Sequence, residues 1–357
     1  MIPALENLFI YLTWDCNLNC KHCWLDKNER SSKLSIKMLN KAIEQAIELG
    51  LNYIKISGGE PLIEKEKVIS IIEKASSNNI KISIETNGTK IDRQWVDVFS
   101  KNSVSVGISI DSYNASIHDH FRGKVNSFNK SIKAVELLKN KGVDVGIIHS
   151  ISMYDERELK KMVAFAENYN VSYLKINPIV KIGNARHYQN EKDDFIFTIS
   201  PEEMLEIKNK FSSNNKHAKV PVNIMLPVGL TNIRGIITNS SSTFSYANCP
   251  TLNLISILPS GDLGLCAEAN RTSDLIFGNL FHDDIVDVWK NSDTLKEIRT
   301  LIPDKLEGVC GNCLVKNICK GSCRTIALSS FGSINSANPI CQKLYDENKF
   351  HLAPKCR

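Results

Sequence analysis

The first half of the chain repeats one pattern of apolar and polar positions. Short apolar runs typical of strands alternate with stretches whose apolar residues recur every three or four positions, as they do on one face of a helix. The first helix is predicted to begin after Ser35 and to end before Gly50, a residue suited to a left-handed cap. The expected strands are Leu8 to Leu12, Tyr53 to Ser57, Ile80 to Ile84, Val104 to Ile110, Val143 to His149 and Val171 to Ile176. The helices expected between them include Ile36 to Ile47, Ile69 to Ile72, Trp95 to Phe99, Ile132 to Leu138 and Leu159 to Phe165.

This order of elements predicts the fold. Alternating strands and helices form a parallel sheet with right-handed crossovers. About six such units are too few to close an eight-stranded barrel. We therefore expect an α/β fold with a partial, TIM-like (β/α)6 barrel, whose ligands bind at the carboxyl ends of the strands. Three of the expected strands end there in small or polar residues, which are Gly58 to Pro61, Glu85 to Gly88, and Ser109 with Asp111.

Length and charge narrow the class of protein. The 357 residues are enough for two domains, and we expect a barrel over residues 1–215, a linker over 216–245 and a cysteine-rich α+β domain over 246–357. No apolar stretch approaches the length of a membrane span, so no membrane partner is expected. The net charge of +5 comes without a dense basic and aromatic cluster, so nucleic acid is not the expected partner either. The chain begins without a secretory signal, which predicts a cytoplasmic location and reduced cysteines.

Three cysteines directly after the first expected strand point to a metal cluster. Cys16, Cys20 and Cys23 are separated by three residues and then by two. Iron–sulfur cubanes normally take four cysteine ligands, so this loop would leave one iron open to a small molecule. A zinc site is the other interpretation, with His22 as its fourth ligand.

The run Gly58-Gly59-Glu60-Pro61 after the second strand favours the iron–sulfur cluster over zinc. Through the cysteine triad and this run the chain resembles the radical S-adenosylmethionine (radical SAM) enzymes. The resemblance implies that the three cysteines hold a 4Fe-4S cluster, and that the amino and carboxylate groups of S-adenosylmethionine (SAM) complete its fourth iron. It also implies the cofactor contacts, which are Gly58, Gly59 and Glu60 at the methionine amino group, His22 near the adenine, and Thr86, Asn87 and Ser109 at the carboxylate and ribose.

Some of these residues have a simpler interpretation. Thr86, Asn87 and Ser109 also fit ordinary capping of strand ends. Arg122 is expected to pair with a carboxylate of the cofactor or of a peptide, and the alternative is an arginine of a surface loop.

Seven of the eight remaining cysteines follow a second pattern. They resemble the cysteine-rich extension of many radical SAM enzymes, the SPASM domain, in which a glycine lies five residues before the second cysteine, as Gly261 does before Cys266. The resemblance implies two auxiliary 4Fe-4S clusters, one held by Cys310, Cys313, Cys319 and Cys341 and the other by Cys249, Cys266 and Cys323.

The second auxiliary set is short of one ligand. The residues from Ser240 to Asn248, where fully ligated relatives carry an extra cysteine, contain none. The open position is expected to bind a substrate thiolate, Cys356, or a water or carboxylate. Cys356 is also the candidate catalytic thiol, because an epimerase needs a hydrogen donor, and its other interpretation is a free surface thiol.

The resemblance implies an oxidoreductase that cleaves SAM reductively to a 5'-deoxyadenosyl radical and abstracts hydrogen from a peptide or protein, leading to a thioether or carbon–carbon link, oxidation or epimerisation. A reducing partner such as ferredoxin or flavodoxin is implied. Because the chain begins at its first strand, we expect a separate leader-binding protein or direct docking of the peptide. Sulfatase maturation ranks low, since Ala267 stands where such enzymes carry an aspartate. The alternatives are the same chemistry on a tetrapyrrole of haem biosynthesis, and a structural zinc-binding protein.

Overall fold

The computed structural model describes residues 2–25, 34–151, 156–179, 183–185, 200–214, 219–230, 244–247 and 249–350. Within these residues the strands form one sheet in the order β11-β10-β9-β1-β2-β3-β4-β5-β6-β7-β8. Their bounds are β1 Asn7–Tyr11, β2 Tyr53–Ser57, β3 Lys81–Thr86, β4 Ser105–Ser109, β5 Val145–Ile151, β6 Leu174–Pro178, β7 Val222–Pro227, β8 Phe244–Ala247, β9 Leu254–Ile257, β10 Asp262–Gly264 and β11 Ile276–Asn279. Pairing is parallel from β9 through β1 to β8, whereas β10 is antiparallel to β9 and to β11.

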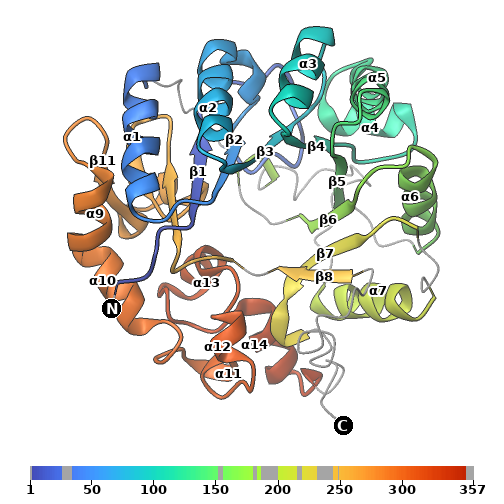
Figure 1. Ribbon diagram of the computed structural model, residues 1–357. Helices are drawn as coiled ribbons and strands as arrows, with labels where there is room; N and C mark the ends of the chain where they lie inside the picture. Colours follow the sequence, from blue (N-terminus) through green and yellow to red (C-terminus); the bar gives the residue numbers. More distant parts are fainter. Residues whose placement is uncertain are drawn as a thin grey trace.

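Helices cover the outer face of the curved sheet and leave its inner face open (Figure 1). The helices of the barrel are α1 Ile36–Glu48, α2 Lys65–Ser77, α3 Arg93–Lys101, α4 Ala115–Arg122, α5 Ser127–Asn140, α6 Glu156–Asn168 and α7 Pro201–Asn214. Those of the carboxyl-terminal part are α9 Ile285–Asn291, α10 Asp293–Leu301, α11 Gly308–Gly311, α12 Lys316–Cys319, α13 Arg324–Phe331 and α14 Pro339–Asp346. Single turns of 3-10 helix occur at Pro61–Ile63, Val228–Leu230, Ala267–Arg271 and Ser273–Leu275.

Local sequence explains both the helices and the two faces of the strands. The Ser35 side chain accepts a hydrogen bond from the N–H of Met38 and so begins α1, as predicted, and Gly50 follows its end with φ +103°. Along β2, Ile54 and Ile56 are fully buried against the helices, while the residues between them are only partly covered. This alternation places polar side chains on the inner face of the sheet.

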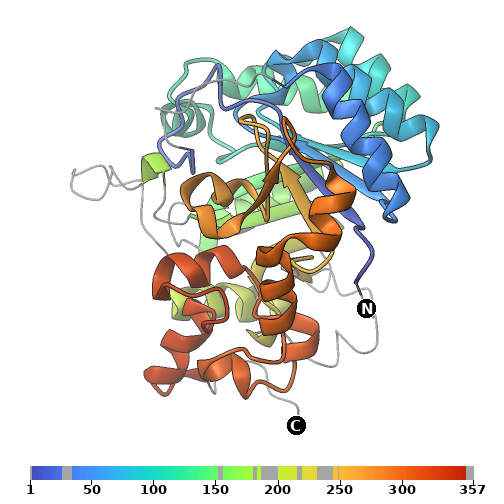
Figure 2. The same ribbon diagram turned by 90° about the vertical axis from the view of Figure 1, so that its left-hand side faces the viewer.

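The carboxyl-terminal part completes the sheet beside β1. Its first strand, β9, pairs with β1 and turns back into β10 as a hairpin. Helix α9 packs on α1, and the indole N–H of Trp289 donates to the carbonyl of Pro3 over 2.9 Å. Helices α11 to α14 lie below the barrel (Figure 2).

The structure confirms the unclosed parallel barrel of alternating strands and helices, and it differs from the expectation at β5, at β6, which begins three residues later than expected, and in the expected linker. Strand β5 lies two residues later than expected. The stretch expected to be a linker contains β7, which pairs with β6. In the carboxyl-terminal part, α9 and α10 are separated at Ser292, whose ψ of 125° is not helical. None of the described helices is long and apolar enough to cross a membrane.

Candidate active site

The cysteine loop follows β1 at the carboxyl edge of the parallel strands. A cavity of about 530 Å³ opens there. The ends of β1 to β4 meet at this edge, which brings together residues that are far apart in the sequence. The predicted site residues that line the cavity are Cys16, Cys20, His22, Cys23, Gly58, Gly59, Thr86, Asn87, Ser109 and Arg122.

Gly58 and Gly59 lie directly against the cysteine loop. The N–H of Gly59 donates to the carbonyl of Thr13 over 2.7 Å. A Cβ on Gly58 would stand 2.5 Å from that same oxygen, and one on Gly59 would stand 2.2 Å from the carbonyl of Asp15. Gly58 also has φ +136°, which residues with side chains rarely adopt. The double glycine therefore lets the loop that carries the cysteines lie on the end of β2.

Glu60 lies behind the cavity wall. Its side chain is fully buried, and its Oε1 accepts from the hydroxyl of Thr86 at 2.7 Å and from the N–H of Leu62 at 3.0 Å. Its Oε2 accepts from the N–H of Asn87 at 2.9 Å. Glu60 is not among the residues that line the cavity, and its expected contact with the methionine amino group stays a prediction. In the structure Glu60 holds the end of β3 in place.

Asn87 connects the end of β3 to the cysteine loop. Its side-chain amide donates to Asn17 Oδ1 at 2.9 Å, and its own Oδ1 accepts from the N–H of Thr89 at 2.9 Å. The amide also lies 3.9 Å from the Cys16 thiol. The polar residues after β3 therefore do more than cap a strand, since they fix the first cysteine of the triad.

Arg122 is paired within the chain. Its Nε lies 2.5 Å from the buried carboxylate of Asp111, and its Nη1 donates to the thiol of Cys20 over 3.6 Å. Burial would raise the pKa of Asp111, but the Arg122 guanidinium outweighs it and holds that pKa well below its usual range. Arg122 is buried rather than a surface loop residue, and its expected pairing with a cofactor or peptide carboxylate stays a prediction.

His22 forms one side of the cavity. Its ring stacks on Phe121 with centroids 4.3 Å apart and an angle of 8°, and its Nε2 lies 3.7 Å from Asp111. Burial lowers the pKa of His22 to about 4, so the ring is neutral near pH 7. Its Nδ1 is buried and has no hydrogen-bond partner among the described residues. A flat apolar surface with one unused polar atom suits a heteroaromatic ligand.

The three thiols suit a multinuclear cluster better than a single ion. Burial raises the pKa of Cys20 to about 12 and also raises that of Cys16, so both are neutral thiols without a metal. No three Cys, His, Asp or Glu side chains in the described ranges converge closely enough for one ion. A cubane takes each thiolate at a different iron, so its ligands stand further apart than those of zinc. All three thiols line the same cavity, and these residues therefore fit the cluster.

The carboxyl-terminal cysteines fall into two groups. One small hollow below the barrel is lined by Cys310, Cys313, Cys319 and Cys341. In the second group, burial and then the neighbouring Cys323 thiol raise the pKa of Cys249 to about 11. Burial followed by the thiols of Cys323 and Cys249 raises the pKa of Cys266 as well. The chain thus gathers the same two sets that the sequence pattern implied. Cys356 lies outside the described residues.

Two family models match the chain. One, described as the radical SAM superfamily, matches residues 10–166, and the other, described as the SPASM iron–sulfur cluster-binding domain, matches residues 249–314. The chain carries a radical SAM domain followed by a SPASM domain. This radical SAM protein is an enzyme whose cofactors are SAM and iron–sulfur clusters, and its carboxyl-terminal part is a SPASM domain.

Curated relatives of this radical SAM protein divide into two kinds. The AdoMet-dependent heme synthase of Oleidesulfovibrio alaskensis is 25% identical over 95% of this chain and 87% of its own length. The antilisterial bacteriocin subtilosin biosynthesis protein AlbA of Bacillus subtilis is 26% identical over 86% of this chain and 66% of its own length. The mycofactocin maturase MftC of Mycolicibacterium smegmatis is 23% identical over 93% of this chain and 82% of its own length.

Solved structures share the fold of this radical SAM protein over nearly its whole length. Streptococcus suis SuiB bound to its precursor peptide SuiA has a TM-score of 0.74 and 17% identity, over 96% of this chain and 76% of that one. The enzyme anSMEcpe with bound AdoMet has a TM-score of 0.71 and 22% identity, over 97% of this chain and 95% of that one.

Sequence reasoning missed several buried charges in this radical SAM protein. Arg324 is buried beside both groups of carboxyl-terminal cysteines and donates to the carbonyl of Ser336 over 2.7 Å. Lys175 points into the barrel from a strand that was expected to be apolar. A lysine inside such a run is the signal that could have revealed it, since charged residues are rarely placed in a core.

Proposed function

We propose that this radical SAM enzyme modifies a peptide or protein. The observation that carries the proposal is the convergence of three thiols and the expected SAM contacts on one cavity of about 530 Å³. Relatives named as a bacteriocin biosynthesis protein and as maturases support a peptide substrate. A structural neighbour of the same fold is bound to a precursor peptide.

In this proposal each side of the cavity has its own task. Cys16, Cys20 and Cys23 hold the 4Fe-4S cluster. When bound, the cluster and SAM supply a reductive cleavage that yields methionine and a 5'-deoxyadenosyl radical, which abstracts hydrogen from the substrate. The protein binds and orients these groups and keeps water and oxygen away from them.

The remaining walls of the cavity bind SAM. The backbone at Gly58 and Gly59 contacts the methionine end, and His22 packs near the adenine. The residues assigned to the SAM carboxylate and ribose are Thr86, Asn87 and Ser109. Arg122 donates toward Cys20 and presents positive charge to the cluster, which lowers the cost of adding an electron.

The SPASM cysteines hold two auxiliary clusters in this proposal. One is ligated by Cys310, Cys313, Cys319 and Cys341. The other is ligated by Cys249, Cys266 and Cys323, and its fourth position is taken by a substrate thiolate, Cys356, or a water or carboxylate. As a catalytic thiol, Cys356 returns a hydrogen atom, and unchanged product and rate after Cys356→Ala would remove it from that role.

Partners follow from the same chemistry. One electron must be delivered for each cleavage, and ferredoxin or flavodoxin is the proposed donor in the cytoplasm. A peptide substrate is proposed to arrive either with a separate leader-binding protein or by docking on the barrel itself.

The test is cleavage of SAM by anaerobically reconstituted, dithionite-reduced enzyme. Formation of 5'-deoxyadenosine is expected from the native chain, together with a mass change in a precursor peptide encoded by a neighbouring gene. The variant Cys16→Ala, Cys20→Ala, Cys23→Ala is the control, and equal deoxyadenosine from both proteins refutes the proposal.

A tetrapyrrole is the second candidate substrate, because two of the relatives are named AdoMet-dependent heme synthase. The same reduced enzyme is supplied with a tetrapyrrole of haem biosynthesis in place of peptide. Turnover of the tetrapyrrole with no change in any peptide selects this function over the first.

A further inference from the structure

The inner face of the barrel is polar below the SAM cavity. On this face Lys55 of β2, Glu85 of β3 and Lys175 of β6 stand between residues that are buried against the helices. Closed barrels of related topology fill this space with branched apolar side chains. A charged interior therefore marks a place for a ligand or water rather than a packed core.

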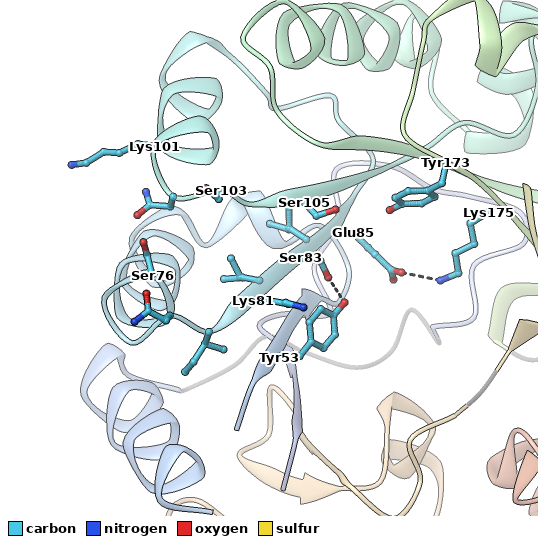
Figure 3. Close-up of a pocket in the computed structure, with 15 residues that line it drawn as sticks. Tyr53, Ser76, Lys81, Ser83, Glu85, Lys101, Ser103, Ser105, Tyr173 and Lys175 are labelled. Atoms are coloured by element: carbon cyan, nitrogen blue, oxygen red, sulfur yellow. Dashed lines mark hydrogen bonds and ion pairs between the residues drawn. The ribbon is translucent and has the colours of Figure 1, made fainter. Parts of the chain in front are cut away.

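A second cavity of about 650 Å³ extends from Glu85 and Lys175 to the amino ends of β3 and β4. Figure 3 shows the side chains that line it, with Tyr53 of β2, Ser83 of β3 and Tyr173, which directly precedes β6, reaching inward. Its volume is typical of small-molecule pockets. The ring of Tyr173 lies against Gly146, where a Cβ would stand 2.2 Å from it. A glycine here makes room for an aromatic wall.

Positive charge predominates around this cavity. Lys81, Lys101 and Lys175 line it together with one carboxylate, that of Glu85. Figure 3 shows Lys101 pointing away at the rim, whereas Lys81 extends toward Tyr53 and Lys175 toward Glu85. The hydroxyl of Tyr53 shares a hydrogen bond of 2.5 Å with that of Ser83. Ammonium and hydroxyl donors that face one space are suited to an anion.

Glu85 joins this cavity to the SAM cavity, because it lines both. Its Oε1 accepts from Lys175 at 3.0 Å, and its Oε2 lies 3.8 Å from Lys55. Within the described part of the chain, this is the only hydrogen bond of Lys175, so two of its three donors remain for a ligand. An anion held by Lys175 would therefore lie directly beside the place where SAM is bound.

We propose that this lumen cavity binds a carboxylate of the substrate through the ammonium groups of Lys175 and Lys81, and so holds the residue to be modified beside SAM. The inference rests on the proposed function, and it narrows the substrate class to a peptide that presents an aspartate, a glutamate or its own terminal carboxylate to the barrel.

A carboxylate suits the site better than a phosphate. Glu85 remains in the wall as a fixed negative charge, and it repels a dianion more strongly than a monoanion. The site offers a lysine ammonium group and tyrosine and serine hydroxyls, each of which donates to one oxygen at a time. Sites that bind phosphate through paired donors are typically built from arginine instead.

Binding is measured by calorimetry on the anaerobic, cluster-loaded enzyme, without reduction or turnover. The probes are a blocked glutamate residue, the matching blocked glutamine, acetyl-dialanine with a free carboxyl terminus, and inorganic phosphate. We expect binding of blocked glutamate or of acetyl-dialanine, and whichever binds more tightly identifies the source of the carboxylate. Blocked glutamine is expected to bind at least about tenfold more weakly, because it lacks a charged acceptor. Phosphate is expected to bind at least about tenfold more weakly as well, because Glu85 repels its dianion more strongly than a carboxylate.

Three variants decide the assignment. Lys175→Gln is expected to weaken carboxylate binding by about 10- to 100-fold, as loss of a charged hydrogen bond does, and Lys81→Gln by a similar factor. Lys101→Gln is the matched control, since this lysine points away at the rim, and it should bind like the native enzyme. Should Lys175→Gln lose its fold, Lys81→Gln still tests the site, because Lys81 is exposed.

Three results would overturn the inference. These are equal affinity in the Lys81 and Lys101 variants, equal binding of glutamate and glutamine probes, and phosphate binding at least as tight as that of the carboxylates. The proposed function fails by a different measurement, the absence of deoxyadenosine, so the two failures are distinguishable.

Discussion

Replacing Glu60 by glutamine is the sharpest test of how the site is held. The carboxylate accepts from one hydroxyl and two backbone N–H groups, and one N–H faces each oxygen. A glutamine has one oxygen and one amide nitrogen. Whichever way it turns, that nitrogen meets either the N–H of Leu62 or the N–H of Asn87, and a buried donor is left without an acceptor.

The size of the effect follows from burial. The Glu60 side chain is 0% exposed, so water cannot replace the missing acceptor. One lost hydrogen bond to a charged group in such a place costs about 2–3 kcal/mol. Glu60→Ala removes all three bonds and should cost about 4–5 kcal/mol. Glu44→Gln is the control, because this carboxylate is 57% exposed in its pair with Lys74, and its loss should cost less than about 1 kcal/mol.

Thermal unfolding of the anaerobic enzyme and SAM binding measure the two consequences. The apparent melting temperature should fall in the order Glu44→Gln, Glu60→Gln, Glu60→Ala, with a drop of about 5 °C or more for the second. SAM affinity should fall with it, since Glu60 holds Thr86 and Asn87. A Glu60→Gln enzyme as stable as Glu44→Gln would refute this role for the buried carboxylate.

Three further outcomes are expected. Gly59→Ala should lose the absorbance of the cluster, because its Cβ would stand 2.2 Å from a carbonyl of the cysteine loop. Gly142→Ala is the control and should keep the cluster, because the space around Gly142 is open. Equal cluster absorbance in the two variants would count against the packing of the loop on Gly59. Burial raises the pKa of Glu85, but Lys175 and Lys55 outweigh it and lower it from 4.5 to about 2. The carboxylate then stabilises the fold fully above about pH 4.5 and loses this effect as the pH falls toward 2. Glu85→Gln should therefore lower the free energy of unfolding by about 1–2 kcal/mol at pH 6 after solvent screening, and by less at pH 3. A loss of stability that does not change with pH would contradict the ion pair. Removal of iron by chelation should abolish deoxyadenosine formation, and re-addition of iron and sulfide should restore it; activity that survives in iron-free enzyme would exclude the cluster.

The barrel could be predicted from the sequence because its strands are marked by strong apolar runs. Ile54 and Ile56, or Ile82 and Ile84, leave little choice of which face meets the helices. The hairpin of β9 and β10 was equally readable, since Gly261 adopts φ +90° in its turn. β7 was missed although Val222, Ile224 and Leu226 alternate as buried positions, because Pro221 and Pro227 border the run and prolines count against a strand inside a sheet.

The site was readable in its residue types and less so in their contacts. The cysteine triad and the double glycine are close in sequence to the elements that position them, so their convergence follows from the strand order. Within the chain Glu60 is bonded to Thr86 and Arg122 is paired with Asp111, and neither internal partner was expected from the sequence. A sequence cannot reveal such pairs, because each joins residues brought together only by the folded sheet.

The pairing of β1 with β9 has a consequence for how the enzyme must be made. Asn7 lies opposite Leu254, so the first strand leaves the ribosome nearly 250 residues before its neighbour exists. Until then its free edge offers unpaired N–H and C=O groups to any other extended chain. Truncation before residue 249 should therefore yield aggregates rather than a soluble barrel, and a host that supplies chaperones during synthesis should raise the yield of the intact enzyme.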